Sequence, residues 1–247
     1  NPHAWMAYNN LGFHLSKIGE TNDSIKQFRT AIKLKPDYEL AHFNLGTALE
    51  QKEEFDKAIA HYRTAIKIKP DYIDSHNNLG NVLRKRGDLD EAMVQYRTAI
   101  KIKPALRYWN KGRLNLAIVH NNLGITLSYK GKIDEAIAHY NAALKFKPNY
   151  VDAHNNLGNA LRKRGEVDEA ILHYKIVIKI QPDYFNAYNN LGNALRERGE
   201  LNEAIIQYRT AIKINPNSAI AHYNLGRAFQ KRAELVKAIA HFRKAIK

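Results

Sequence analysis

The sequence predicts an all-α solenoid of seven antiparallel helix pairs, and three regularities indicate this fold. The seven prolines of the 247-residue chain lie 34, 34, 34, 44, 34 and 34 residues apart. Seven of the thirteen glycines directly follow a leucine at the same place in each interval. Apolar residues between these markers recur with helical spacing. A fixed period of this length is typical of repeat proteins, in which each unit buries its apolar surface against its neighbours.

We interpret the chain as a single array of seven repeats with one insertion. The repeats cover residues 3–36, 37–70, 71–104, 115–148, 149–182, 183–216 and 217–247. Ten extra residues, 105–114, lie between the third and fourth repeats. The most regular segment is HNNLGNALRKRG at residues 154–165, with near copies at residues 76–87 and 188–199.

Each repeat reads as two short amphipathic helices. In the fifth, His154, Leu157 and Leu161 fall on one face of a first helix, at i, i+3 and i+7. Gly165 supplies the left-handed conformation that ends this helix. Asp168 is the capping or first-turn acid of the second helix. Helices of this length are marginal alone in water, so the repeats must stack to bury their apolar faces.

These residues resemble the tetratricopeptide repeat, and the resemblance covers essentially the whole chain. The 34-residue period, the leucine–glycine pair, the alanine and aromatic of the second helix and the closing proline all match that family's pattern. The resemblance implies a right-handed superhelix, with first helices lining a concave surface and second helices facing outward. Histidine replaces the family's usual aromatic residue in five repeats. This pattern is similar to the repeats of O-linked N-acetylglucosamine transferases and of bacterial repeat arrays. These histidines are His42, His76, His120, His154 and His222.

An asparagine two residues before the repeat glycine is present in all seven repeats. A side-chain amide offers donors and acceptors together, so a row of them can hold the backbone of an extended peptide. The alternative is that these amides bond to the adjacent helix and fix the stacking register. In the transferases that the array resembles, the matching asparagines hold substrate backbone. The predicted ladder consists of Asn10, Asn44, Asn78, Asn122, Asn156, Asn190 and Asn224.

A second set of polar residues lies one and four residues after the glycine. Their guanidinium groups are suited to selecting acidic side chains or a carboxylate on the ligand. The alternative reading is that they are solvated helix-end cations. This set contains Asn81, Arg84, Asn159, Arg162, Asn193 and Arg196, with Arg227 in the seventh repeat.

The formal charge of +15 comes largely from one sequence segment that recurs in the repeats. Eleven lysines belong to an A-I-K-x-K-P segment at the end of the second helix, where cations oppose the negative end of the helix dipole. Nucleic-acid binding is therefore not the leading expectation, although RNA binding through a basic surface stays an alternative. The eleven are Lys33, Lys35, Lys67, Lys69, Lys101, Lys103, Lys145, Lys147, Lys179, Lys213 and Lys247.

The sequence gives no reason to expect catalysis, a metal or a cofactor. There is no cysteine, no histidine pair at H-x-x-x-H spacing, no phosphate-binding glycine loop and no nucleophile elbow. No apolar run reaches the roughly 18 residues of a membrane span. With no charged-then-apolar leader, we expect a cytoplasmic protein.

The insertion and the C-terminal repeat are the irregular parts of the array. The insertion places Tyr108 and Trp109 among basic residues, which makes it a candidate for a partner contact or a lid. An inert extended connection or a lengthened helix is the favoured alternative. Glu53 and Ala233 replace the helix-ending glycine, so we expect fraying to begin at the C-terminal end. The uncapped last helix suggests either a longer protein or self-association.

The leading functional prediction is a non-enzymatic scaffold that holds an extended, acidic peptide or protein segment in the concave groove. The asparagine ladder would bind the backbone and the arginines would supply selectivity. From the enzyme class, the alternative is the substrate-recruiting part of a larger glycosyltransferase-like chain.

Overall fold

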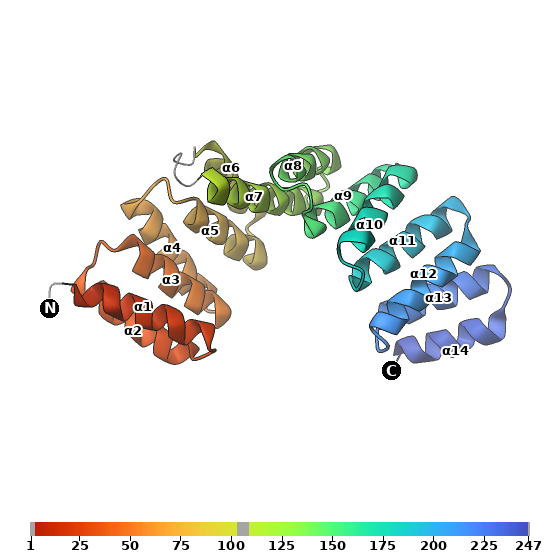
Figure 1. The fold of residues 1–247 in the computed structure, drawn as a ribbon, viewed down its shortest axis with the longest axis horizontal. Helices are drawn as coiled ribbons and strands as arrows, with labels where there is room; N and C mark the ends of the chain where they lie inside the picture. Colours follow the sequence, from red (N-terminus) through yellow and green to blue (C-terminus); the bar gives the residue numbers. More distant parts are fainter. Residues whose placement is uncertain (1–2, 103–108, 247) are drawn as a thin grey trace. The chain divides into compact units, whose positions relative to one another are not determined.

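The computed structural model describes residues 3–102 and 109–246, and this part of the chain contains fourteen α-helices (Figure 1). The first seven are α1 Ala4–Lys17, α2 Thr21–Leu34, α3 Glu39–Gln51, α4 Phe55–Ile68, α5 Ile73–Arg86, α6 Leu89–Lys101 and α7 Trp109–Tyr129. The others are α8 Ile133–Phe146, α9 Val151–Arg164, α10 Val167–Ile180, α11 Phe185–Arg198, α12 Leu201–Ile214, α13 Ala219–Lys231 and α14 Leu235–Ile246. Fourteen helices fit seven helix pairs, so the predicted all-α solenoid is confirmed.

The helices form two compact units, residues 1–130 and 131–247. In the first unit α1 packs on α2, α3 on α4 and α5 on α6, while α2, α4 and α6 each also contact the next first helix. In the second unit α9 packs on α10, α11 on α12 and α13 on α14, again with contacts from each second helix to the following first helix. First helices also contact first helices, as α1 does α3 and α9 does α11. The core is therefore a series of junctions between neighbours, as the sequence predicted.

The repeat glycine seats the aromatic ring of the same repeat. A Cβ atom built on Gly158 would lie 2.7 Å from Cε1 of Tyr174, which is closer than a methyl group can approach a ring carbon. The same contact recurs from Gly12 with Phe28 to Gly226 with Phe242. Tyr174 is completely buried as a result. The repeat glycine therefore marks a close approach between the two helices of a repeat, and the approaching group is a ring.

The first helices end in the left-handed conformation that the sequence predicted. Gly165 has φ +96° and directly follows α9, and four other glycines at this position also have positive φ. Glu53 and Ala233 adopt the same conformation without a glycine, with φ of 59° and 61°. These two residues carry a steric cost that glycine avoids, because the left-handed region brings Cβ close to the following carbonyl.

Part of the insertion lengthens a helix. The helix α7 begins at Trp109 and has 21 residues, whereas the other thirteen described helices have 12 to 14. Residues 109–114 of the insertion therefore belong to the first helix of the fourth repeat. Tyr108, and the side chain of Trp109 that we predicted as a contact, lie outside the described residues. Among the helices in residues 3–102 and 109–246, none has the length and apolar character that crossing a membrane requires.

Candidate functional site

The predicted asparagine ladder forms hydrogen bonds between consecutive repeats. Asn190 on α11 donates from Nδ2 to Oδ1 of Asn155 on α9, at 3.0 Å. The acceptor lies one position before the ladder residue of its own repeat. The same bond links Asn44 to Asn9 at 2.9 Å, Asn122 to Asn77 at 2.9 Å and Asn224 to Asn189 at 2.9 Å. Four ladder amides thus have the partners that the stacking alternative predicts.

The ladder amides differ in exposure. Asn44, Asn122 and Asn190 are half-buried, as are Asn78 and Asn156, whereas Asn224 is buried and Asn10 is exposed. Asn78 follows a repeat with Phe43 at the acceptor position, and it instead accepts a 3.3 Å bond from Nδ2 of Asn77. A side-chain amide has two N–H groups and a carbonyl with two lone pairs. One donated bond therefore fixes the orientation of the amide and leaves its second N–H and its carbonyl able to form further hydrogen bonds.

The asparagines one residue after the glycine accept from the buried tyrosines. The Tyr174 hydroxyl donates to Oδ1 of Asn159 at 2.8 Å, and the same bond joins Tyr96 to Asn81 and Tyr208 to Asn193. Burial raises the pKa of Tyr174 to about 12, so the hydroxyl stays protonated and remains a donor at neutral pH. These asparagines anchor the second helix to the first, a role that the sequence analysis did not assign.

The predicted arginines lie in different electrostatic settings. Arg162 on α9 forms a 2.6 Å ion pair with Glu197 on α11. Arg196 donates from Nε to the Tyr208 hydroxyl at 3.4 Å. Arg84 is half-buried on α5. Arg227 is exposed on α13, with its guanidinium 5.9 Å from the ring centre of Tyr223.

The first unit carries the same ion pair with its charges exchanged. Glu50 on α3 stands at the position of Arg162, and Lys85 on α5 stands at the position of Glu197. Their side chains form a 2.8 Å ion pair, and Glu50 also accepts from the Tyr62 hydroxyl at 3.0 Å. The sequence analysis missed Lys85 and Glu197, five residues after the glycine. A signal that could have found them is their charge, which is opposite to that of the residue four positions after the glycine of the preceding repeat.

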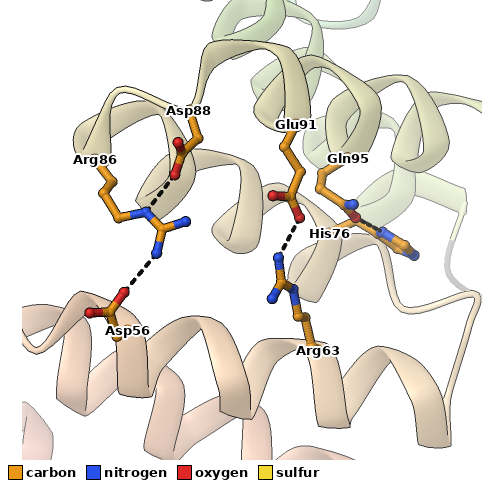
Figure 2. Close-up of polar contacts among 7 residues, drawn as sticks. All are labelled: Asp56, Arg63, His76, Arg86, Asp88, Glu91 and Gln95. Carbon is orange, nitrogen blue, oxygen red and sulfur yellow. Dashed lines mark hydrogen bonds and ion pairs between the residues drawn. The ribbon is translucent and has the colours of Figure 1, made fainter.

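A second charged contact joins the outer ends of neighbouring repeats. Arg86, at the end of α5, binds Asp56 in the first turn of α4 at 2.6 Å and Asp88 in its own repeat at 2.5 Å (Figure 2). Arg164 likewise bridges Asp134 and Glu166. The first-turn acids therefore bind the next repeat. In α2, α4, α6, α8, α10 and α12, the residue that precedes the first turn does not cap the helix with its side chain.

The recurring histidines are structural pairs. His154 places Nε2 2.9 Å from the carbonyl oxygen of Pro148 and Nδ1 2.9 Å from Nδ1 of His173. The same geometry recurs between His42 and His61 and between His222 and His241. In the sixth repeat the hydroxyl of Tyr188 takes the place of Nε2 and donates to the carbonyl oxygen of Pro182. In the third repeat Gln95 replaces the second histidine beside His76 (Figure 2). Across residues 3–102 and 109–246, no three histidine or acidic side chains gather to hold a metal ion.

Several of the repeated lysines lie over aromatic rings. The ammonium group of Lys35 is 4.3 Å from the ring centre of Trp5, and that of Lys147 is 4.6 Å from the ring centre of Tyr150. Lys33 and Lys67 occupy last turns of second helices, as expected. Part of the positive charge thus stabilises the loops between repeats, because a cation over a ring face is attracted by its quadrupole.

Models of the tetratricopeptide repeat match most of this chain. A model described as a TPR repeat matches residues 15–53, 51–83, 124–161, 158–195 and 192–232, and a second, described as tetratricopeptide repeat, matches residues 73–106. The chain belongs to the tetratricopeptide repeat family. No curated protein matches it. The finer resemblance to O-linked N-acetylglucosamine transferases therefore stays a prediction.

Solved structures with this fold are similar to the chain at low sequence identity. PilF of Pseudomonas aeruginosa has a TM-score of 0.77 at 19% identity, over 93% of this chain and 98% of that one. YrrB, described as a TPR protein with an unusual peptide-binding site, has a TM-score of 0.61 at 21% identity, over 78% and 95%. The Cut9–Hcn1 hetero-tetramer of the APC/C has a TM-score of 0.74 at 19% identity, and the match covers 91% of this chain but only 42% of that one.

Proposed function

We propose that this tetratricopeptide repeat protein is a non-enzymatic scaffold that binds an extended peptide segment along its first helices. The ladder amides bind the peptide backbone, and the charged residues at the ends of the first helices select its side chains. A similar fold in YrrB, whose described property is a peptide-binding site, supports the class of ligand.

The orientation of the half-buried ladder amides carries this proposal. In Asn44, Asn122 and Asn190 one N–H is directed to the preceding repeat, which holds each amide plane in a defined orientation. The second N–H and the carbonyl are then presented in the same way from repeat to repeat. A pre-oriented amide loses little rotational freedom on binding, so more of each hydrogen bond appears as affinity.

The charged residues near the ends of the first helices give the scaffold its selectivity. Arg196 and Arg227 have no carboxylate partner in the contacts found for them, whereas Arg162 is neutralised by Glu197. An acidic side chain on the ligand is therefore expected to bind near α11 and α13 more strongly than near α9. In the first unit the Glu50–Lys85 pair favours no net charge.

The test compares two asparagines that share one hydrogen bond. Asn155→Ala and Asn190→Ala each break the bond between these two side chains, so both should lower the free energy of unfolding by about 1 kcal/mol. Only Asn190→Ala removes a ladder amide. A phage-displayed peptide library first yields a binding peptide, and calorimetry then measures its affinity for each variant.

We expect Asn190→Ala to weaken peptide binding about 3- to 10-fold, as for the loss of one backbone hydrogen bond, and Asn155→Ala to weaken it less. Asn78→Ala extends the test to the first unit. If all three variants bind the peptide as the parent chain does while their melting temperatures fall, the ladder is purely structural. A failure to enrich any peptide would remove the proposal altogether.

A further inference from the structure

Two arginines form ion pairs across the junction of the second and third repeats. Arg63 on α4 binds Glu91 on α6 at 2.6 Å, and Arg86 at the end of α5 binds Asp56 on α4 at 2.6 Å (Figure 2). Two cations therefore face two carboxylates across this junction. Both guanidinium groups are neutralised by side chains of the neighbouring repeat.

The junction of the first and second repeats keeps the two cations and lacks both acids. Arg29 and Lys52 stand at the two cation positions, whereas Asn22 and Lys57 stand at the two acid positions. Lys52 still donates to Oδ1 of Asn22 at 2.8 Å, but the amide carries no charge. Compared with the next junction along the chain, two carboxylates are therefore absent and one cation is added.

A cavity lies at this junction, between α2 and α4. Its volume is about 450 Å³, which falls within the range of about 300–1,000 Å³ that is usual for small-molecule sites. The polar part of its lining consists of Asn22, Lys26, Arg29, Lys52, Glu54 and Lys57. The residues that distinguish this junction by charge thus surround a space large enough for a small ligand.

The carboxylates near the cavity do not balance its positive charge. Asp23 pairs with Lys26 at 2.7 Å. Glu54 pairs with Lys57 at 2.6 Å and lies 3.7 Å from Lys52. The four cations of the lining therefore share two carboxylates, which leaves two positive charges unpaired.

Arg29 is the cation most available to a ligand. It is exposed on α2, and no carboxylate among the described residues pairs with it. A guanidinium group can donate two parallel hydrogen bonds to a phosphate, and lysine ammonium groups add further charge-assisted bonds. A phosphate monoester carries a charge of about −1.5 to −2 at pH 7, which matches two unpaired cations better than a single carboxylate does.

The junction of the sixth and seventh repeats has the same replacements but a different neighbour for its cations. Asn202 and Lys237 stand at its acid positions. The ring centre of Phe229 lies 5.8 Å from the guanidinium carbon of Arg209 and 5.5 Å from Nζ of Lys237. The ring face attracts both cations. Leu49 stands at this position in the second repeat, so the cations of the first junction lack such a ring.

We propose that the cavity between α2 and α4 binds a small phosphate monoester. The phosphate lies against Arg29, Lys52 and Lys57, and the organic part of the ligand occupies the rest of the cavity. Oδ1 of Asn22 accepts from Lys52, so the N–H groups of the same amide are further donors to the phosphate. The site shares no residue with the asparagine ladder and does not depend on peptide binding.

The test rebuilds the balanced junction at this site. Isothermal titration calorimetry measures the binding of inorganic phosphate and of ribose 5-phosphate, with ribose as the uncharged control. The double variant Asn22→Asp with Lys57→Glu lowers the charge of the site by three, so it should bind both phosphates at least about tenfold more weakly.

A matched pair of single variants separates this site from the net charge of the chain. Arg29→Gln should weaken the binding of both phosphates about tenfold. Arg63→Gln removes the same charge at the equivalent position of the next repeat, where Glu91 already neutralises it, so it should bind as the parent chain does.

The four substituted residues, Asn22, Arg29, Lys57 and Arg63, are all exposed, so the variants should fold, which circular dichroism verifies. Ribose 5-phosphate should raise the melting temperature of the parent chain and leave that of the double variant unchanged. The proposal is overturned if neither phosphate binds at millimolar concentrations, or if ribose binds as well as ribose 5-phosphate. Equal weakening by Arg29→Gln and Arg63→Gln, or unchanged binding in the double variant, also overturns it.

Discussion

The Nδ1 atoms of His154 and His173 lie 2.9 Å apart, and this contact fixes the tautomers of the two neutral rings. The Pro148 carbonyl can only accept, so Nε2 of His154 carries a proton and donates to it. In the neutral ring Nδ1 of His154 is then an acceptor, and Nδ1 of His173 donates to it. A further proton on His154 would set two donors against each other, whereas a further proton on His173 would enter at Nε2 and place a charge on a half-buried ring beside His154.

These pairs predict a loss of stability in mild acid. Burial, followed by the nearby His154, lowers the pKa of His173 to about 4, and burial with His42 and Arg29 does the same for His61. An unfolded histidine titrates near 6.5. The unfolded chain therefore binds more protons between pH 6.5 and 4, so the stability present above pH 6.5 is lost as the pH falls through this interval.

The third repeat supplies the matched variant for this prediction. Gln95 stands opposite His76 at the place of His173, and its amide does not titrate. His173→Gln should melt like the parent chain at pH 7. At pH 5 its melting temperature should be about 2–4 °C above that of the parent chain, because protonation of the unfolded histidine costs the parent on the order of 1 kcal/mol. Gln95→His should have the opposite effect. Equal acid sensitivity of all three chains in thermal melts would refute the role of the pairs.

Gly158→Ala should destabilise the fifth repeat. In a solvated helix this change stabilises by about 1 kcal/mol, because alanine is the better helix former. Here the new methyl group would lie 2.7 Å from the Tyr174 ring, and such overpacking costs about 1–3 kcal/mol or more. Urea unfolding measures the net change, which we expect to be a loss. A gain in stability would mean that the ring moves aside without cost.

Ala233→Gly should stabilise the seventh repeat. Ala233 has φ 61°, and releasing a left-handed alanine is worth about 1 kcal/mol. Gly199→Ala is the control, because Gly199 has φ 94° and nothing lies within 4 Å of an added Cβ. It should lose a similar amount. Hydrogen exchange of α13 and α14 checks the prediction, and unchanged protection in the glycine variant would contradict it.

Glu197→Gln should raise affinity for acidic peptides. The substitution removes the carboxylate that pairs with Arg162 and leaves the guanidinium to the ligand. We expect a gain of several-fold for a peptide with glutamate or aspartate and little change for its amidated counterpart. Fluorescence anisotropy with the two peptides measures this difference. Equal affinity changes for both peptides would show that Arg162 does not select charge.

Features that depend on residues close together in the chain were the ones that the sequence predicted. Gly158 and Gly165 have different tasks, close approach and a left-handed helix end, and their positions within the unit distinguish them. Helix ends, the leucine face and the 34-residue unit follow in the same way, because local conformation and burial depend on residues near in the chain.

Contacts between repeats were harder to predict from the sequence. The bond from Asn190 to Asn155 spans 35 residues, and the ion pair from Arg198 to Asp168 spans 30. Each partner looks like an ordinary polar surface residue when its own helix is considered alone. The insertion was undecided for a related reason, since only the structure places Trp109 at the start of α7.

The sequence by itself determined the family, the number of repeats and the two helices of each, because a regular period leaves one way to bury each apolar face. Only the tertiary structure decided which polar side chains face each other, since a stacking offset of one helix position changes every partner. That offset joins Asn190 to Asn155 and His154 to His173.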